Sequence, residues 1–165
     1  MDFPAPEPSP ANGWWEHHAA LLIDSHRRLT GRELAVVGVT SEEKARHLYQ
    51  APFVVLSHDG GTDPVFTYAN LTAQRLFALP WERIVGMPSR YSAEAPARKE
   101  RQRLLAQVAR FGYIDDYQGV RIASTGERFL IRRATVWNLL DADGKPVGQA
   151  ASFAEWTPLP AGDGA

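Results

Sequence analysis

The chain has 165 residues, with 18 Lys and Arg against 19 Asp and Glu, and it contains no cysteine. This length fits one ordinary domain, and the near-zero net charge gives no general electrostatic case for nucleic acid or acidic membranes as partners. The missing cysteines exclude disulfides, thiolate catalysis and thiolate metal sites. Because residues 1–4 do not resemble a signal peptide and no apolar run nears the roughly 20 residues that cross a bilayer, we expect a cytoplasmic protein without a membrane partner.

The first fifty residues divide into a proline-rich leader and a helical extension. Residues 1–13 hold four prolines and no apolar periodicity, which predicts a disordered leader. From Trp14 to Leu29 apolar residues recur at helical spacing, so we expect a helix with one apolar face that ends at Gly31. Thr40 and Glu43 form a capping box for a second helix that reaches to about residue 50.

Two short strands and a helix follow. The apolar runs 53–56 and 64–69 flank a turn rich in Gly and Asp, which predicts an antiparallel pair. Asn70 suits the N-cap of a helix over 71–79, because its side-chain oxygen can accept a hydrogen bond from an N–H group of the first turn. A capping role alone predicts that Asn70→Ala costs about 1 kcal/mol of stability.

A longer amphipathic helix is predicted between Ser92, as its cap, and Gly112, which ends it. We expect its buried stripe to consist of Leu104, Leu105, Val108 and Phe111. The mixed-charge run Arg98–Arg103 on the same helix is typical of a solvated face, so we expect it to lie in solvent rather than on nucleic acid.

The last fifty residues predict three strands. Turn residues at 124–126 and 141–145 separate them as hairpins. In the long middle strand, 128–140, the alternation of side chains places Arg133 and Trp137 on one face. Neither face is cleanly polar, which predicts helices over one side and the N-terminal helix or a partner over the other. The sequence does not decide which of the two faces lines the pocket.

The order strand, turn, strand, short helix, with Tyr68-Ala69-Asn70 leading into the helix and Trp81–Gly86 after it, resembles a PAS domain. The segments 115–122, 134–139 and 147–153 are similar to a narrower family, the MEKHLA domain, a PAS-like module that also occurs alone in bacteria. The resemblance covers roughly residues 14–156. It implies an α+β fold with a five-stranded antiparallel sheet, helices on one face and an N-terminal helical extension. The chain then divides into leader (1–13), helical extension (14–50), PAS-like domain (51–157) and flexible tail (158–165).

The resemblance implies a sensory or regulatory module that binds a small molecule or a protein partner. A flavin–cysteine or coumaric-acid light sensor needs a thiol, which this chain lacks. Haem needs an axial ligand, and we expect the five histidines, at positions 17, 18, 26, 47 and 58, to be surface residues. His58, Asp59 and Asp63 are better explained by turn chemistry than by a metal site. No cofactor is identified, no catalytic motif appears, and we expect no enzyme activity.

Six residues of the predicted sheet are candidate ligand-binding or interface residues, because each brings an aromatic or hydrogen-bonding group to it: Tyr117, Arg121, Arg133, Trp137, Asn138 and Gln149. If Arg133 faces inward, its charge requires either an internal carboxylate, Asp115 or Asp116, or an anionic ligand.

Two other function classes remain open. The pocket under the sheet could serve a small cofactor-binding protein or an enzyme, or the chain could be a purely dimerising domain. The apolar face of the helix from Trp14 to Leu29 predicts packing on the chain's own sheet or on a second copy, and we expect a homodimer through it.

Overall fold

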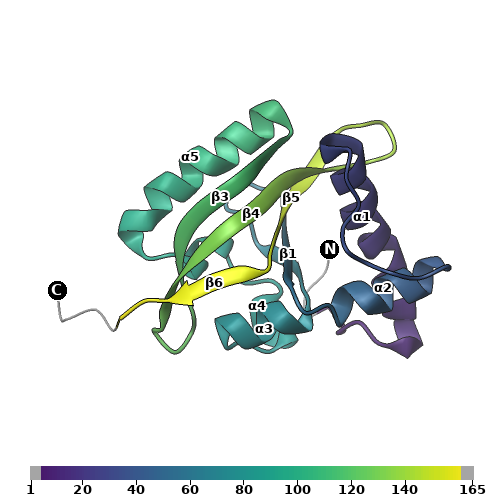
Figure 1. Ribbon diagram of the computed structural model, residues 1–165, viewed down its shortest axis with the longest axis horizontal. Helices are drawn as coiled ribbons and strands as arrows, with labels where there is room; N and C mark the ends of the chain where they lie inside the picture. Colours follow the sequence, from purple (N-terminus) through teal and green to yellow (C-terminus); the bar gives the residue numbers. More distant parts are fainter. Residues whose placement is uncertain (1–4, 161–165) are drawn as a thin grey trace.

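A computed structural model describes residues 5–160 of the chain, the side chains of 95 and 96 excepted. Figure 1 shows a single twisted sheet with helices packed against it. The helices, with 3-10 helices marked η, are η1 (Pro10–Trp15), α1 (Glu16–Thr30), α2 (Ser41–Tyr49), α3 (Leu71–Phe77), α4 (Trp81–Ile84), η2 (Ser89–Ser92) and α5 (Ala95–Phe111). The strands are β1 (Val54–Asp59), β2 (Phe66–Ala69), β3 (Tyr113–Ile122), β4 (Arg128–Leu140), β5 (Pro146–Phe153) and β6 (Glu155–Pro158). None of the helices within residues 5–160 is long and apolar enough to cross a membrane.

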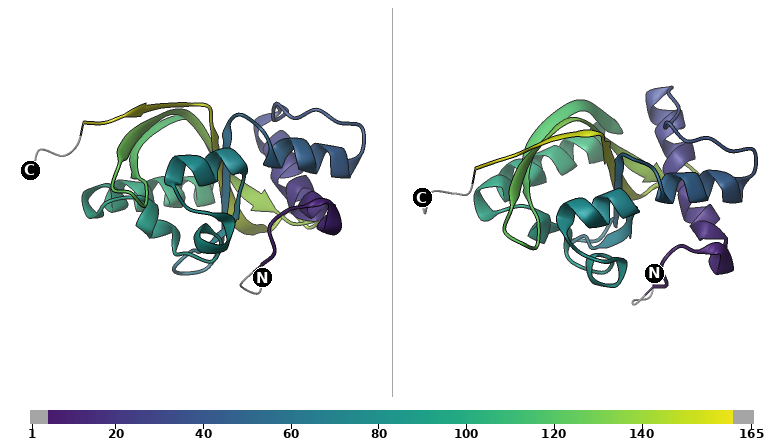
Figure 2. Two further views of the ribbon diagram at one scale, coloured as in Figure 1. Left: turned by 90° about the horizontal axis from the view of Figure 1, so that it is seen from below. Right: turned by 60° about the horizontal axis from the view of Figure 1, so that its bottom comes forward.

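The strands form one antiparallel sheet in the order β2-β1-β5-β4-β3. This confirms the predicted PAS-like α+β fold with five antiparallel strands. The short strand β6 is an addition: β5 pairs only with residues 135–140 of β4, and β6 pairs with residues 129–132 of the same edge. The sheet arches over α3, α4 and α5, while α1 and α2 lie on the other side of it (Figure 2).

Helix α1 packs on the face of the sheet that points away from α5. Leu22 is fully buried there, and its carbonyl accepts a hydrogen bond of 3.2 Å from Nε1 of Trp137. The hydroxyl of Ser25 accepts a 2.9 Å bond from the backbone N–H of Leu140. The apolar face of this helix is therefore covered by the chain's own sheet, the first of the two packings expected for it, and the homodimer stays a prediction.

The prediction of a disordered leader is wrong for residues 5–13. Nε1 of Trp81 donates to the carbonyl of Ala5 at 2.9 Å, and the hydroxyl of Tyr49 donates to Glu7 at 2.5 Å. These bonds bind the proline-rich segment to α4 and α2, because buried indole and phenol groups need polar partners. Residues 1–4 lie outside the described part of the chain.

The predicted flexible tail is largely outside the described residues, which end at position 160. Within it, Pro158 belongs to β6, and the backbone N–H of Leu159 donates to the carbonyl of Arg128 at 2.8 Å. The beginning of the tail is thus part of the sheet edge.

Three helix ends follow the local rules of the sequence. Gly31 ends α1 with a left-handed backbone, φ 73°. The hydroxyl of Thr40 accepts from the N–H of Glu43 at 3.1 Å and completes the capping box of α2. Asn70 caps α3 by accepting from the N–H of Ala73 at 3.1 Å.

Strand β4 carries a bulge that changes which side chains share a face. Two residues lie between Ile131 and Ala134 where β3 has one, and Arg133 takes a positive φ of 52°. A compensating bulge on β3 includes Asp116, φ 55°. After the bulge the alternation is shifted by one, so Trp137 points to α1 and not to the side that Ile131 faces.

The bulge also turns Arg133 away from the interior of the sheet, so the inward-facing orientation considered from the sequence is not formed. Its side chain is 77% exposed, and its Nε lies 3.6 Å from Oε2 of Glu155. The internal pair with Asp115 is not formed either, since Asp115 binds Arg32 and accepts a 2.9 Å bond from Thr135.

Candidate functional site: the cavity under helix α5

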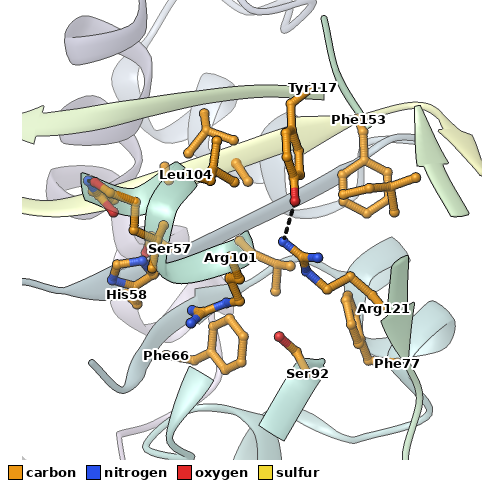
Figure 3. Close-up of a pocket in the computed structure, with 17 residues that line it drawn as sticks. Ser57, His58, Phe66, Phe77, Ser92, Arg101, Leu104, Tyr117, Arg121 and Phe153 are labelled. Carbon is orange, nitrogen blue, oxygen red and sulfur yellow. Dashed lines mark hydrogen bonds between the residues drawn. The ribbon is translucent and has the colours of Figure 1, made fainter. Parts of the chain in front are cut away.

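A cavity of about 60 Å³ lies between α5 and the concave face of the sheet (Figure 3). Strands β1 to β5 line it together with α3, η2 and α5, so it lies in the interior of the PAS-like domain. We call it the α5 cavity. Its lining residues are Leu56, Ser57, His58, Phe66, Phe77, Ser92, Arg101, Leu104, Leu105, Tyr117, Arg121, Ile131, Val136, Gln149, Ala150, Ala151 and Phe153.

Arg101 enters the α5 cavity from the helix. It is 7% exposed, and its Nη2 donates to the hydroxyl of the buried Ser89 at 2.5 Å. Burial, and after it the charge of Arg121, lowers the pKa of Arg101 to about 10, so the guanidinium keeps its charge near pH 7.

Two predictions about α5 itself are wrong. Ser92, predicted as its cap, donates to the Ser89 carbonyl, while Glu94 occupies the N-cap. Phe111, predicted in its buried stripe, is exposed.

Arg121 enters from β3 and is 8% exposed. Its Nη1 donates to the carbonyl of Val120 at 2.8 Å, and its Nη2 donates to the hydroxyl of Tyr117 at 3.3 Å, the bond drawn in Figure 3. The Tyr117 side chain reaches it by lying over Gly119, where an added Cβ would be 2.4 Å from the tyrosine hydroxyl. The absence of a side chain at Gly119 therefore leaves the space that Tyr117 needs to reach Arg121.

No carboxylate balances these two guanidinium groups among the described residues. None of the lining residues is Asp or Glu, and neither Arg101 nor Arg121 takes part in an ion pair within 4 Å. Asp63, whose charge reaches Arg101 from a distance, is bound to Arg90. The α5 cavity thus has a local charge of about +2 in a chain whose net charge is −1.

His58 is a further buried polar residue of the α5 cavity. It lies at the end of β1, 9% exposed, and its Nδ1 is 2.7 Å from the carbonyl of Asp59. A carbonyl only accepts, so Nδ1 carries the proton and Nε2 of the neutral ring is an acceptor. Burial lowers the pKa of His58, and the charge of Arg101 lowers it further. Nε2 is buried without a hydrogen-bond partner in the described part of the chain.

Two amides fasten α5 to the sheet at one end of the cavity. Asn138 donates from Nδ2 to the carbonyl of Val108 at 3.0 Å, and Gln149 donates from Nε2 to the carbonyl of Leu105 at 3.0 Å. Gln149 also donates to Oδ1 of Asn138 at 3.2 Å. The NH2 groups of both side chains are therefore used in hydrogen bonds to backbone carbonyls of α5.

The structure brings together part of the candidate set. Tyr117, Arg121 and Gln149 line the α5 cavity, and Asn138 adjoins it through Gln149. The grouping of Arg133 and Trp137 with them is wrong, because the β4 bulge sends both side chains away from the cavity. Trp137 is fully buried against α1 and packs edge-on to His26.

Sequence reasoning missed Arg101 and His58. Arg101 precedes Leu104 by three positions and Val108 by seven, so it lies on the apolar stripe of α5 and not on a solvated face. That spacing was the available signal. The expectation of surface histidines is confirmed for His17, which is exposed, and is wrong for His26 and His58, which are buried. His18 is partly buried, its Nε2 lies 3.0 Å from the Ser57 hydroxyl, and burial lowers its pKa to about 4.

The α5 cavity does not fit a flavin or a haem in this structure. Pockets for ligands of that size have roughly 300–1,000 Å³, far above the 60 Å³ found here. Within residues 5–160 no group of three or more His, Asp or Glu side chains is arranged to hold a metal ion. Asp59 accepts from the N–H groups of Gly61 and Val65 in its turn, and Asp63 binds Arg90.

A family model of the MEKHLA domain matches residues 16–158. The chain belongs to the MEKHLA domain family. This match covers α1 as well as the sheet and α5, so the N-terminal helix is part of the MEKHLA domain. The resemblance read from the sequence is thereby confirmed. Among curated protein sequences, none matches the chain.

Solved structures similar to this MEKHLA domain are PAS and light-oxygen-voltage (LOV) domains. The PAS domain of a Colwellia psychrerythraea protein has a TM-score of 0.58 at 12% identity, covering 72% of this chain and 95% of its own. A LOV domain studied with a flavin analogue has a TM-score of 0.53 at 14% identity, covering 70% and 84%. The blue-light activated histidine kinase EL346 of Erythrobacter litoralis has 0.54 at 16%, covering 69% and only 35% of that longer chain. At these identities the likeness establishes the fold.

Proposed function

We propose that this MEKHLA domain is a sensory module that binds a small molecule in the α5 cavity. The observation that carries the proposal is the combination of apolar walls with two buried guanidinium groups, on Arg101 and Arg121, that have no carboxylate partner among the described residues. Beside them, Nε2 of His58 is buried without a hydrogen-bond partner in the same part of the chain. Ligand sites in proteins are typically apolar clefts with a few polar groups that orient the ligand. Membership of a PAS-like family supports the same reading.

The size and chemistry of the α5 cavity favour a ligand other than a flavin chromophore. The chain has no cysteine to form a flavin adduct, and the cavity is too small for the ring system. The proposed module is therefore a chemical sensor. We also propose that it acts in the cytoplasm, because a chain without cysteine forms no disulfide and needs no oxidising compartment.

A route for the signal leads from the α5 cavity to the N-terminal helix. Ser57 is a lining residue on β1, and its hydroxyl is bonded both to Nε2 of His18 on α1 and, at 2.8 Å, to the hydroxyl of Thr67 on β2. A ligand that shifts β1 would change this contact. Hydrogen exchange of α1 amides with and without ligand measures the coupling, and equal exchange would speak against this route.

The experiment that tests ligand binding compares the purified full chain with a variant whose cavity is filled. Ala151 lies in the lining and Ala142 in the exposed β4–β5 turn. We expect native mass spectrometry of the wild type and of the matched control Ala142→Leu to show a bound small molecule that Ala151→Leu lacks. Circular dichroism confirms that each variant is folded. A wild type that carries no small molecule, and whose melting temperature no metabolite raises, contradicts the proposal.

The homodimer expected from the sequence is a separate proposal. Light scattering of the full chain at micromolar concentration measures it, and a monomer contradicts it. Such a monomer would leave the ligand-binding proposal untouched, because every lining residue of the α5 cavity belongs to one chain.

A further inference from the structure

We propose that the α5 cavity binds a short hydroxycarboxylate, whose carboxylate Arg101 and Arg121 hold and whose hydroxyl donates to Nε2 of His58. This inference rests on the proposed function and names the class of ligand. It depends on three features of the α5 cavity: its uncompensated charge, its size and walls, and the free acceptor on His58.

The charge calls for an anion. Two guanidinium groups carry ten N–H donors. Three of these donors have partners in the described part of the chain: Ser89 for Arg101, and Val120 and Tyr117 for Arg121. Buried charges in proteins are normally paired, and an unpaired one is strongly destabilising. An anion in the α5 cavity supplies both the charge and the acceptors that the surrounding residues do not.

The size and the walls favour a short carboxylate over phosphate. A cavity of 60 Å³ is well below the roughly 150 Å³ that holds benzene, so the ligand has only a few non-hydrogen atoms. The remaining walls are largely apolar, with Leu56, Phe66 and Ile131 among them. Phosphate presents oxygen in every direction and would place some of it against these walls, whereas a carboxylate has a carbon side to bury.

His58 favours a ligand that also carries a hydroxyl group. Its Nε2 is an acceptor because Nδ1 already donates to the Asp59 carbonyl at 2.7 Å. A bare carboxylate has no donor to offer it, but a hydroxyl group on the neighbouring carbon does. The two guanidinium groups therefore favour an anion, and Nε2 of His58 favours a hydrogen-bond donor on the same ligand.

The test is a titration of the full chain with five probes: glycolate, lactate, acetate, glycolamide and inorganic phosphate. A ligand of five non-hydrogen atoms binds no tighter than about micromolar, so concentrations run from ~1 µM to ~10 mM. We expect glycolate or lactate to raise the melting temperature by roughly 5–10 °C at about 100-fold its dissociation constant. Acetate should bind less well, and glycolamide, which lacks the charge, should have no effect.

Variants assign the contacts. Arg101→Met and Arg121→Met should weaken glycolate binding by about tenfold or more, the loss expected for a charge-assisted hydrogen bond. Arg103→Met is the matched control, because Arg103 is exposed on the same helix, and it should bind glycolate like the wild type. His58→Phe keeps an aromatic ring without the acceptor, and it should bind glycolate and acetate equally.

The stability of the ligand-free variants separates a site from a structural pair. An arginine whose charge is uncompensated can be replaced without loss, so ligand-free Arg101→Met should melt no lower than the wild type. A large loss of stability in Arg101→Met, without any effect of glycolate on the wild type, overturns the inference.

Other outcomes separate this inference from the proposed function. If phosphate binds more tightly than every carboxylate, or if acetate equals glycolate in the wild type, the hydroxycarboxylate assignment is wrong. If no anion binds but native mass spectrometry finds a neutral molecule that Ala151→Leu loses, this inference fails and the proposed function stands. If neither measurement finds a ligand, both fail.

Discussion

The substitution Asn70→Ala tests how much of this fold depends on a single buried amide. Asn70 is fully buried, and its side chain makes four hydrogen bonds. Oδ1 accepts from the N–H groups of Val55 and Ala73, both at 3.1 Å. Nδ2 donates to the carbonyls of Leu48 at 3.1 Å and Phe53 at 2.8 Å. One side chain thus joins the end of α2, the start of β1 and the first turn of α3.

The expected cost follows from these bonds. Capping alone costs about 1 kcal/mol, the value expected from the sequence. A net contribution of about 1 kcal/mol for each of the four bonds raises this to about 4 kcal/mol for Asn70→Ala. For a domain of this length that corresponds to a fall in melting temperature of roughly 8–16 °C.

Urea unfolding followed by tryptophan fluorescence measures the difference in free energy of unfolding. Thr40→Ala is the matched control, because the Thr40 hydroxyl caps α2 at an exposed position and should cost only about 1 kcal/mol. A cost for Asn70→Ala no larger than that of Thr40→Ala would falsify the argument and reduce Asn70 to a helix cap.

Three further outcomes follow from the packing around the sheet. Gly119→Ala should leave the fold intact but displace the Tyr117 hydroxyl from Arg121, since only the tip of a flexible side chain must move; unchanged NMR signals of the Arg121 guanidinium would contradict this. Burial lowers the pKa of His18 to about 4, whereas in the unfolded chain it titrates near its usual 6.5. The unfolded state therefore binds more protons between these values, and stability falls as the pH drops from about 6.5 towards 4. His18→Gln should make this fall shallower, and equal slopes in urea unfolding at pH 7, 6 and 5 would refute it. Leu22→Ala, in the fully buried contact of α1 with the sheet, should cost about 3 kcal/mol of global stability. If α1 alone unfolds in this variant while the rest of the domain keeps the stability of the wild type, the prediction is wrong.

Local chemistry in the sequence determined the elements and their order. A Thr–Glu capping box, an Asn before a helix and a Gly after one act within three or four residues, so Thr40, Asn70 and Gly31 predicted helix ends that the structure confirms. Hairpin turns and apolar runs likewise predicted the five main strands and the antiparallel sheet. These features also carried the resemblance to the MEKHLA family.

Which side chains of β4 share a face depended on contacts between residues distant in sequence. Period-two counting placed Arg133 and Trp137 together and would have been correct for a regular strand. The bulge beside Ile131 adds one residue opposite β3, and everything after it changes face. A bulge is a property of a pair of strands, so neither strand alone predicts it. The cost of Asn70→Ala has the same origin, because three of its four bonds join segments that only the fold brings together.

The candidate site was decided almost entirely by tertiary structure. Tyr117, Arg121 and Gln149 were chosen from the sequence for their strands, and these strands do line the α5 cavity. Arg101 belonged to a charged run that normally faces solvent, and His58 to an apparent turn. Packing of α5 across the concave sheet buries both, because burial depends on which surfaces meet rather than on the neighbours of a residue in the chain.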